Sequence, residues 1–151
     1  MSAYESERVV LNQIAFVRVE DVLIQCIGQF DAGEEDFASW LTRLRAEDYR
    51  VLLISARGNG GLSAKQRGRV AEFWKTSGRT PPRVALLSES TVARGVLIAI
   101  GWLLDNPTKA FAPHDLRSAL AFLGTSASHA VIATELDMLH AGLQAKARRS
   151  A

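Results

Sequence analysis

RGNGGLSAKQR, residues 57–67, separates a short apolar run from a basic amphipathic run. Glycines between a strand and a helix are typical of phosphate-binding loops. Both standard spacings fail, because Ser63 stands where the Walker pattern Gly-x-x-x-x-Gly-Lys-Ser/Thr and the dinucleotide pattern Gly-x-Gly-x-x-Gly require glycine. Ser63 and Gln66 instead form Ser-x-x-Gln, a capping box whose side chains satisfy backbone N–H groups at a helix start. The stretch therefore predicts a glycine-rich turn and a capped helix.

The elements before this stretch are a hairpin and a helix. Residues 14–19 (IAFVRV) and 22–28 (VLIQCIG) are apolar runs separated by two acidic residues, which predicts two antiparallel strands. The helix is predicted by four apolar residues at positions i, i+3, i+4 and i+7, namely Phe37, Trp40, Leu41 and Leu44.

After the stretch, strands and helices alternate. Strands are predicted at residues 50–55, 83–88 and 108–112, and helices at 63–77, 90–104, 113–123 and 129–147. Pro113 suits the first turn of its helix. The strands at 50–55 and 83–88 are continuous apolar runs, as expected where helices cover both faces of a parallel sheet. The order predicts one α/β domain with a mixed sheet of about five strands and an extra C-terminal helix.

Composition excludes several classes of protein. The chain has 151 residues, 48% of them hydrophobic and 23% charged, which suits one globular domain. A net charge of only +2 argues against nucleic-acid binding, despite a pI near 9.0. The apolar runs fall short of the roughly 20 residues that a membrane span needs, and the polar N-terminus is not a signal peptide. The single cysteine, Cys26, lies in a strand pattern and is expected to pack in the core of a cytoplasmic protein.

Motifs for catalysis and metal binding are missing from the sequence. His114, His129 and His140 do not form a pair with metal-ligand spacing, so no metal and no cofactor are expected. The nucleophile elbow Gly-x-Ser-x-Gly is also missing, so no catalytic residue is predicted.

The order of elements resembles STAS domains, the fold of anti-sigma-factor antagonists and sulfate-transporter tails, and is most similar to the SpoIIAA-like bacterial branch. The residues that carry the resemblance are GGLSAKQR (60–67), RVALLSESTVARGVLIAIGWL (83–103) and KAFAPHDLRSALAFL (109–123). It implies an N-terminal extension at residues 1–11, a STAS-like domain at 12–124 and a C-terminal helix with a basic tail at 125–151. Signalling STAS domains carry a phosphorylatable serine at the position of Ser63, usually after Asp. Here Leu62 precedes it, which departs from that pattern.

Loop residues are expected to meet at one edge of the sheet, since the carboxyl ends of parallel strands share an edge where ligands bind. The candidates for a regulatory or anion-binding site are Arg57, Gly60, Ser63, Ser88, Ser90 and Arg94. Hydroxyls, guanidinium groups and two helix N-termini would suit an anion or a phosphopeptide. Ordinary helix capping explains Ser63 and one of the other two serines equally well.

The helix at residues 90–104 is apolar on every side, and Arg94 is the only charged residue between 91 and 104. Such a helix must be buried all round. Three covers are open: the C-terminal helix, a second subunit, or an apolar ligand, as in the similarly shaped CRAL-TRIO lipid carriers. The interface candidates are Leu97, Ile98, Trp102 and Leu104.

The sequence thus favours a non-enzymatic, STAS-like interaction or regulatory module, which binds a protein partner or forms a homodimer. The alternatives are a carrier or sensor of a small apolar or anionic ligand and, third, an enzyme without a recognisable motif.

Overall fold

The computed structural model describes residues 7–58 and 60–150, except for the side chains of residues 96, 100, 102–104 and 150. Within these residues, six strands form one sheet, in the order of the sequence. They are β1 (Val9–Val10), β2 (Ile14–Val19), β3 (Val22–Ile27), β4 (Val51–Ala56), β5 (Arg83–Leu87) and β6 (Thr108–Phe111). β1, β2 and β3 pair antiparallel, whereas β3 to β6 run parallel. The predicted mixed sheet is confirmed, with β1 as an additional short edge strand.

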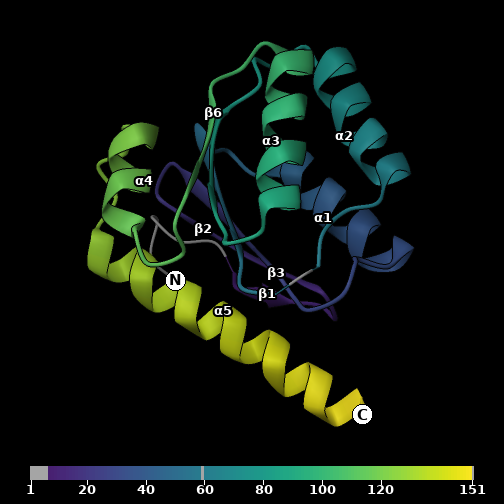
Figure 1. Cartoon of the computed structure of the whole chain (residues 1–151), viewed down its shortest axis with the longest axis vertical. Coiled ribbons are helices and arrows are strands. Elements are labelled where there is room, and N and C mark those ends of the chain that lie inside the picture. Colours follow the sequence, from purple (N-terminus) through teal and green to yellow (C-terminus); the bar gives the residue numbers. More distant parts are fainter. Residues whose placement is uncertain (1–6, 59, 151) are drawn as a thin grey trace.

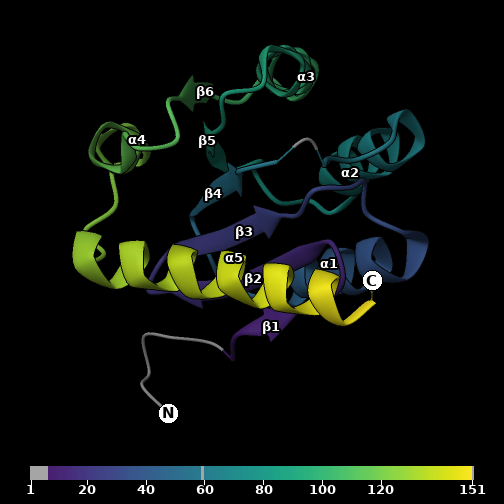
Figure 2. The same ribbon diagram turned by 60° about the horizontal axis from the view of Figure 1, so that its bottom comes forward.

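Helices cover both faces of the sheet (Figure 1 and Figure 2). They are α1 (Glu34–Ala46), α2 (Ala64–Thr76), α3 (Thr91–Leu104), α4 (Leu116–Leu123) and α5 (His129–Ser150). α1, α2 and α3 each connect neighbouring parallel strands. Because such crossovers are right-handed, strands in sequential order place all three helices on one face. α4 and α5 lie on the other face.

The sheet separates two apolar cores. Val22, Ile24 and Cys26 of β3 face the core beneath α4 and α5, whereas Leu23 faces the core beneath α1, α2 and α3. This alternation follows from the pleat of the strand, which points successive side chains to opposite faces. Cys26 is fully buried, as predicted.

The start of α4 differs from the prediction. The helix begins at Leu116, and Asp115 is its N-cap, with Oδ1 accepting a hydrogen bond of 3.4 Å from the backbone N–H of Ser118. Aspartate is favoured at this position because its carboxylate satisfies a free N–H group of the first turn. Pro113 therefore lies in the turn before α4 and not in its first turn.

α5 packs against β1, β2, β3 and α4 through an apolar stripe of Ile132, Leu136, Leu139 and Leu143. It does not cover α3, because α3 packs on the opposite face of the sheet. Of the three covers considered for the helix at residues 90–104, shielding by the C-terminal helix is therefore wrong. In the described part of the chain, no helix is both long enough and apolar enough to cross a membrane. The proposed division at residues 12 and 125 stays a prediction.

Candidate functional site at the carboxyl edge of the sheet

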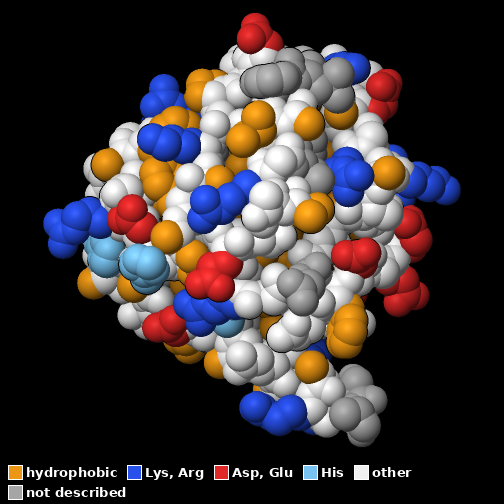
Figure 3. Space-filling view, viewed as in Figure 1, with side chains coloured by type: hydrophobic (Ala, Val, Ile, Leu, Met, Phe, Trp, Pro, Cys, Tyr) orange, Lys and Arg blue, Asp and Glu red, His pale blue; other side chains and the backbone are white. Residues whose placement is uncertain are grey.

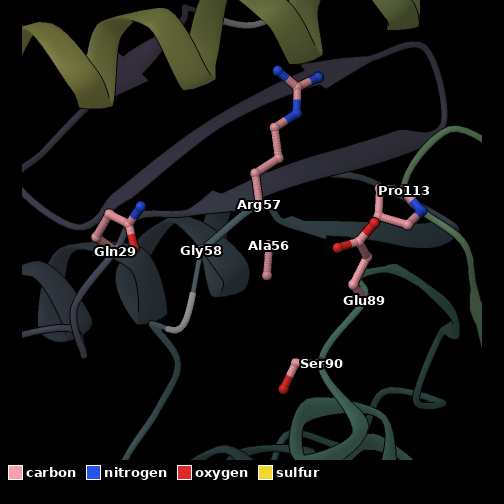
Figure 4. Close-up of a pocket in the computed structure, with 7 residues that line it drawn as sticks. All are labelled: Gln29, Ala56, Arg57, Gly58, Glu89, Ser90 and Pro113. Atoms are coloured by element: carbon pink, nitrogen blue, oxygen red, sulfur yellow. The ribbon is translucent and has the colours of Figure 1, made fainter.

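The loops that follow β3, β4, β5 and β6 surround a hollow at the carboxyl edge of the sheet (Figure 4). Its volume is about 470 Å³, and it is lined by Gln29, Ala56, Arg57, Gly58, Glu89, Ser90 and Pro113. The carboxyl edge is where open α/β folds bind their ligands. Loop residues therefore do lie together at this edge, as expected, but most of the side chains that line the hollow differ from the six candidates.

Two glycines of the opening stretch shape the wall of this hollow. A Cβ atom on Gly60 would lie 2.3 Å from the carbonyl oxygen of Gly28 and 2.4 Å from that of Phe30. A Cβ atom on Gly58 would lie 2.7 Å from Oε1 of Gln29. Both approaches are too close for a side chain, so these glycines let the loop after β4 pack against the loop after β3. Gly60 is thus a packing residue.

Ser63 caps α2 as predicted. Its Oγ accepts a hydrogen bond of 3.1 Å from the backbone N–H of Gln66, and its own N–H donates to Oε1 of Gln66 at 3.0 Å. The side-chain amide of Gln66 also donates to the carbonyl oxygen of Ala32 at 3.0 Å, which ties α2 to the loop before α1. The capping box is therefore confirmed.

The loop between β5 and α3 is held by its own polar groups. The backbone N–H of Ser90 donates to Oγ of Ser88, and Oγ of Ser90 accepts from the N–H of Ala93. Nε and Nη2 of Arg94 both donate to the carbonyl oxygen of Ser88, at 2.9 and 2.8 Å. Ser88 and Arg94 therefore fix this loop, and of the six candidates only Arg57 and Ser90 line the hollow.

Arg57 also reaches α5. Its Nη2 lies 2.9 Å from Oδ1 of Asp137, and the two side chains are 48% and 74% exposed. A second hollow, of about 140 Å³, lies beneath the C-terminal half of α5 and shares Gln29, Arg57 and Gly58 with the first. Arg57 thus separates two neighbouring hollows.

A buried polar pair joins α5 to the sheet beside Arg57. Oγ of Ser55 and Nε2 of His140 are 2.9 Å apart, and the two residues are 3% and 5% exposed. Burial, assisted by the positive charge of Arg57, lowers the pKa of His140 from 6.5 to about 4, although Asp137 opposes the shift. Because Ser55 lies within the core, the pair anchors α5 and does not present a nucleophile to a substrate.

Burial also raises the pKa of the Cys26 thiol well above its usual value. The thiolate is the reactive form of cysteine, so this side chain is a packing residue and not a nucleophile.

Sequence reasoning missed Gln29, Glu89, Asp137 and His140 as residues of this edge. Gln29 and Glu89 follow the ends of β3 and β5, so position along the chain was a usable signal. Asp137 and His140 flank the apolar stripe of α5 at a spacing of three residues, but the sequence did not show which surface that stripe covers.

The outer surface of α3 forms a second candidate site. Its exposed residues with described side chains carry no charge, and they are Thr91, Val92, Gly95, Ile98 and Ala99. Val92 is 77% and Ile98 42% exposed, and hydrophobic side chains are visible over α3 in Figure 3. Leu97 was expected at an interface but is 8% exposed and packs in the core beneath α3. The side chains of Trp102 and Leu104 lie outside the described part of the structure.

Comparison with solved structures gives an informative likeness. No family model matches the sequence, and no curated protein matches it. Among solved structures, the chain is similar to an uncharacterized protein of the DUF3478 family from Shewanella loihica PV-4, described as having a SpoIIAA-like fold. The two are 22% identical with a TM-score of 0.52, and the match covers 82% of this chain and 98% of the other. The chain therefore has the SpoIIAA-like, STAS-like fold that its sequence resemblance implied.

Proposed function

We propose that the protein is a non-enzymatic interaction module that forms a homodimer through the outer surface of α3. The observation that carries the proposal is the exposure of Val92 and Ile98 on a helix whose exposed described residues are uncharged, while the half-buried Arg94 is turned back to the carbonyl oxygen of Ser88. The buried positions of Cys26 and Ser55 support the non-enzymatic part, because neither can meet a substrate at the surface.

The surface of α3 contrasts with that of its neighbour. The exposed residues of α2 include Lys65, Glu72 and Lys75, which is usual for a solvated helix. An uncharged apolar helix surface is typical of a contact site. A closed apolar cavity beneath α3 would favour a lipid-like ligand instead, whereas the described Leu97 packs in the core on that side.

The shape of the surface suits a second copy of the same chain. Gly95 and Ala99 are exposed one turn apart, and, apart from the chain next to Gly95 and the backbone of α3 itself, no described atom lies within 4 Å of the place where a Cβ on Gly95 would stand. Small residues with this spacing let two helices approach closely. Because the exposed described residues of α3 are uncharged, two copies of this surface can meet about a twofold axis without repulsion between charges of those residues.

The described side chains suggest a dimer of modest affinity. Full burial of a valine or isoleucine contributes about 1.5–3 kcal/mol, and both residues are already partly covered. Two copies of Val92 and Ile98 would then contribute on the order of 5 kcal/mol, against which the loss of rotational and translational freedom must be set. Even without that cost, about 5 kcal/mol corresponds to a dissociation constant of about 0.2 mM, so we expect a weak dimer that is populated only at the upper end of the micromolar concentration range.

Light scattering across protein concentrations from about 1 to about 500 μM tests the proposal. We expect the mass to rise from monomer to dimer, and Ile98→Glu to keep the chain monomeric. Val131→Glu is the matched control, because Val131 is 39% exposed on α5, on the opposite face of the sheet. Circular dichroism confirms that each variant is folded. A monomer mass throughout the range, or equal loss of dimer in both variants, would refute the α3 interface.

A further inference from the structure

We propose that the hollow beside Arg57 binds a free amino acid or another equally small amino-carboxylate. This site is separate from the proposed dimer surface, since it lies at the carboxyl edge of the sheet and not on the outer side of α3. Among the described residues, its lining supplies a positive group, a negative group and a side-chain amide, from Arg57, Glu89 and Gln29.

The two polar side chains that flank the hollow are available to a ligand. Gln29 and Glu89 stand on opposite sides of it in Figure 4, and the Glu89 carboxylate is directed inward. Within the described residues, neither the amide of Gln29 nor the carboxylate of Glu89 has a hydrogen-bond partner, while neighbouring polar groups of the same loops are paired. An ammonium group offers three donors, which suits the carboxylate and the amide oxygen together.

Arg57 can supply the complementary charge. Its guanidinium group points toward α5 in Figure 4 and uses Nη2 on Asp137. Both partners of this ion pair are substantially exposed, and exposed pairs are weak. A guanidinium group has five N–H donors and matches a carboxylate bidentately, so a ligand carboxylate can share Arg57 with Asp137 or replace it.

The frame around these groups is fixed before any ligand arrives. Arg94 and Ser88 hold the backbone on either side of Glu89. On the other wall, Oε1 of Gln13 accepts from the N–H of Phe30 at 2.9 Å, and Gly60 packs against the same loop. The backbone of the site therefore loses little conformational freedom on binding, and only the side chains of Gln29, Arg57 and Glu89 have to be ordered.

Size and charge select the class of ligand. The volume of about 470 Å³ lies within the range of about 300–1,000 Å³ that is usual for small-molecule sites, so an amino acid with its side chain can be accommodated. The positive side chain of Arg57 and the negative side chain of Glu89 favour a zwitterion over a polyanion such as a nucleoside triphosphate. The charged and polar lining also disfavours a hydrocarbon chain.

Nitrogen-15 NMR of the full chain tests this site, with each of the twenty common L-amino acids titrated to about 10 mM. For at least one of them we expect saturable shifts of the backbone amides of Gly58, Glu89 and Ser90. The corresponding amine without its carboxylate, and the carboxylate without its amine, should each bind at least about tenfold more weakly.

Three variants assign the interactions. Glu89→Gln should weaken amino-acid binding at least about tenfold, whereas Glu72→Gln, an exposed change on α2, should leave it unchanged. Asp137→Asn should tighten binding, because it releases Arg57 from its ion pair. Saturable shifts for none of the twenty amino acids, or equal effects of Glu89→Gln and Glu72→Gln, would overturn the proposal. Neither outcome depends on the dimer, which is followed separately by mass.

Discussion

His140 should make the stability of the protein depend on pH between about pH 7.5 and about pH 5. The residue is 5% exposed, and its Nε2 lies 2.9 Å from Oγ of Ser55. Burial is the largest influence on the pKa of His140 and disfavours the protonated ring. The charge of Arg57 also disfavours protonation, whereas the charge of Asp137 favours it. Acid therefore perturbs a group that the fold holds in its neutral form.

The sign and size of the effect follow from the two pKa values of His140, about 4 in the folded chain and 6.5 as the ordinary value. The unfolded chain binds the proton more readily, so acid favours unfolding. The stabilisation that comes from keeping His140 neutral is complete above pH 6.5 and is lost as the pH falls toward 4. Between about pH 7.5 and about pH 5, the free energy of unfolding should fall by about 2 kcal/mol, at 1.36 kcal/mol per pKa unit.

Urea unfolding at the two pH values measures this difference. His140→Gln removes the titrating group and should reduce the difference to well under half, even if it lowers stability at both pH values. His129→Gln is the matched control, because His129 is an exposed histidine on the same helix. If His140→Gln keeps the full pH dependence, or if His129→Gln removes it, the assignment to His140 is wrong.

Three further predictions concern helix and loop positions. Ser63→Ala should lower the free energy of unfolding by about 1 kcal/mol, and Ser63→Asp should not, because aspartate also caps a helix. Gly60→Ala should cost at least about 2 kcal/mol in urea unfolding, since its Cβ would overlap two carbonyl oxygens, and a neutral result would contradict this close packing. Gly95→Ala and Gly68→Ala should each stabilise the monomer by about 0.5–1 kcal/mol, since both glycines are helical and have open space, yet only Gly95→Ala should weaken the dimer measured by light scattering. Equal effects of the two on the mass would count against close approach at Gly95.

The sequence was sufficient for most of the secondary structure, because each element carries its own local signal. The hairpin from Ile14 to Ile27 shows two apolar runs with an acidic turn, and Glu20 adopts a positive φ of 51° in that turn. Ser63 and Gln66 are three residues apart, so their capping box needs no information from elsewhere in the chain. These local preferences predict the structure correctly because the tertiary packing favours the same conformations.

The positions of α3 and α5 could not be predicted, because their patterns do not specify a surface. α3 is apolar on all sides, so its sequence does not distinguish the buried Leu97 from the exposed Ile98. The stripe of α5 requires a partner surface but does not identify it, and β1 to β3 provide one that faces away from α3. The residues that flank the hollow, Gln29 and Glu89, lie in loops without a motif and meet only through the sheet.

The two proposed sites meet at one short loop, and its hydrogen bonds explain how they can remain distinct. Glu89 faces the hollow, while Ser90 next to it caps α3. Arg94 donates twice to the carbonyl oxygen of Ser88 and so holds this loop to the first turn of the helix. A ligand at Glu89 would therefore contact a loop that is already fixed, and Ile98 lies two turns further along α3, on its outer surface. Because of this separation, each site offers the other an internal control: Ile98→Glu leaves the hollow intact, and Glu89→Gln leaves the outer surface of α3 intact.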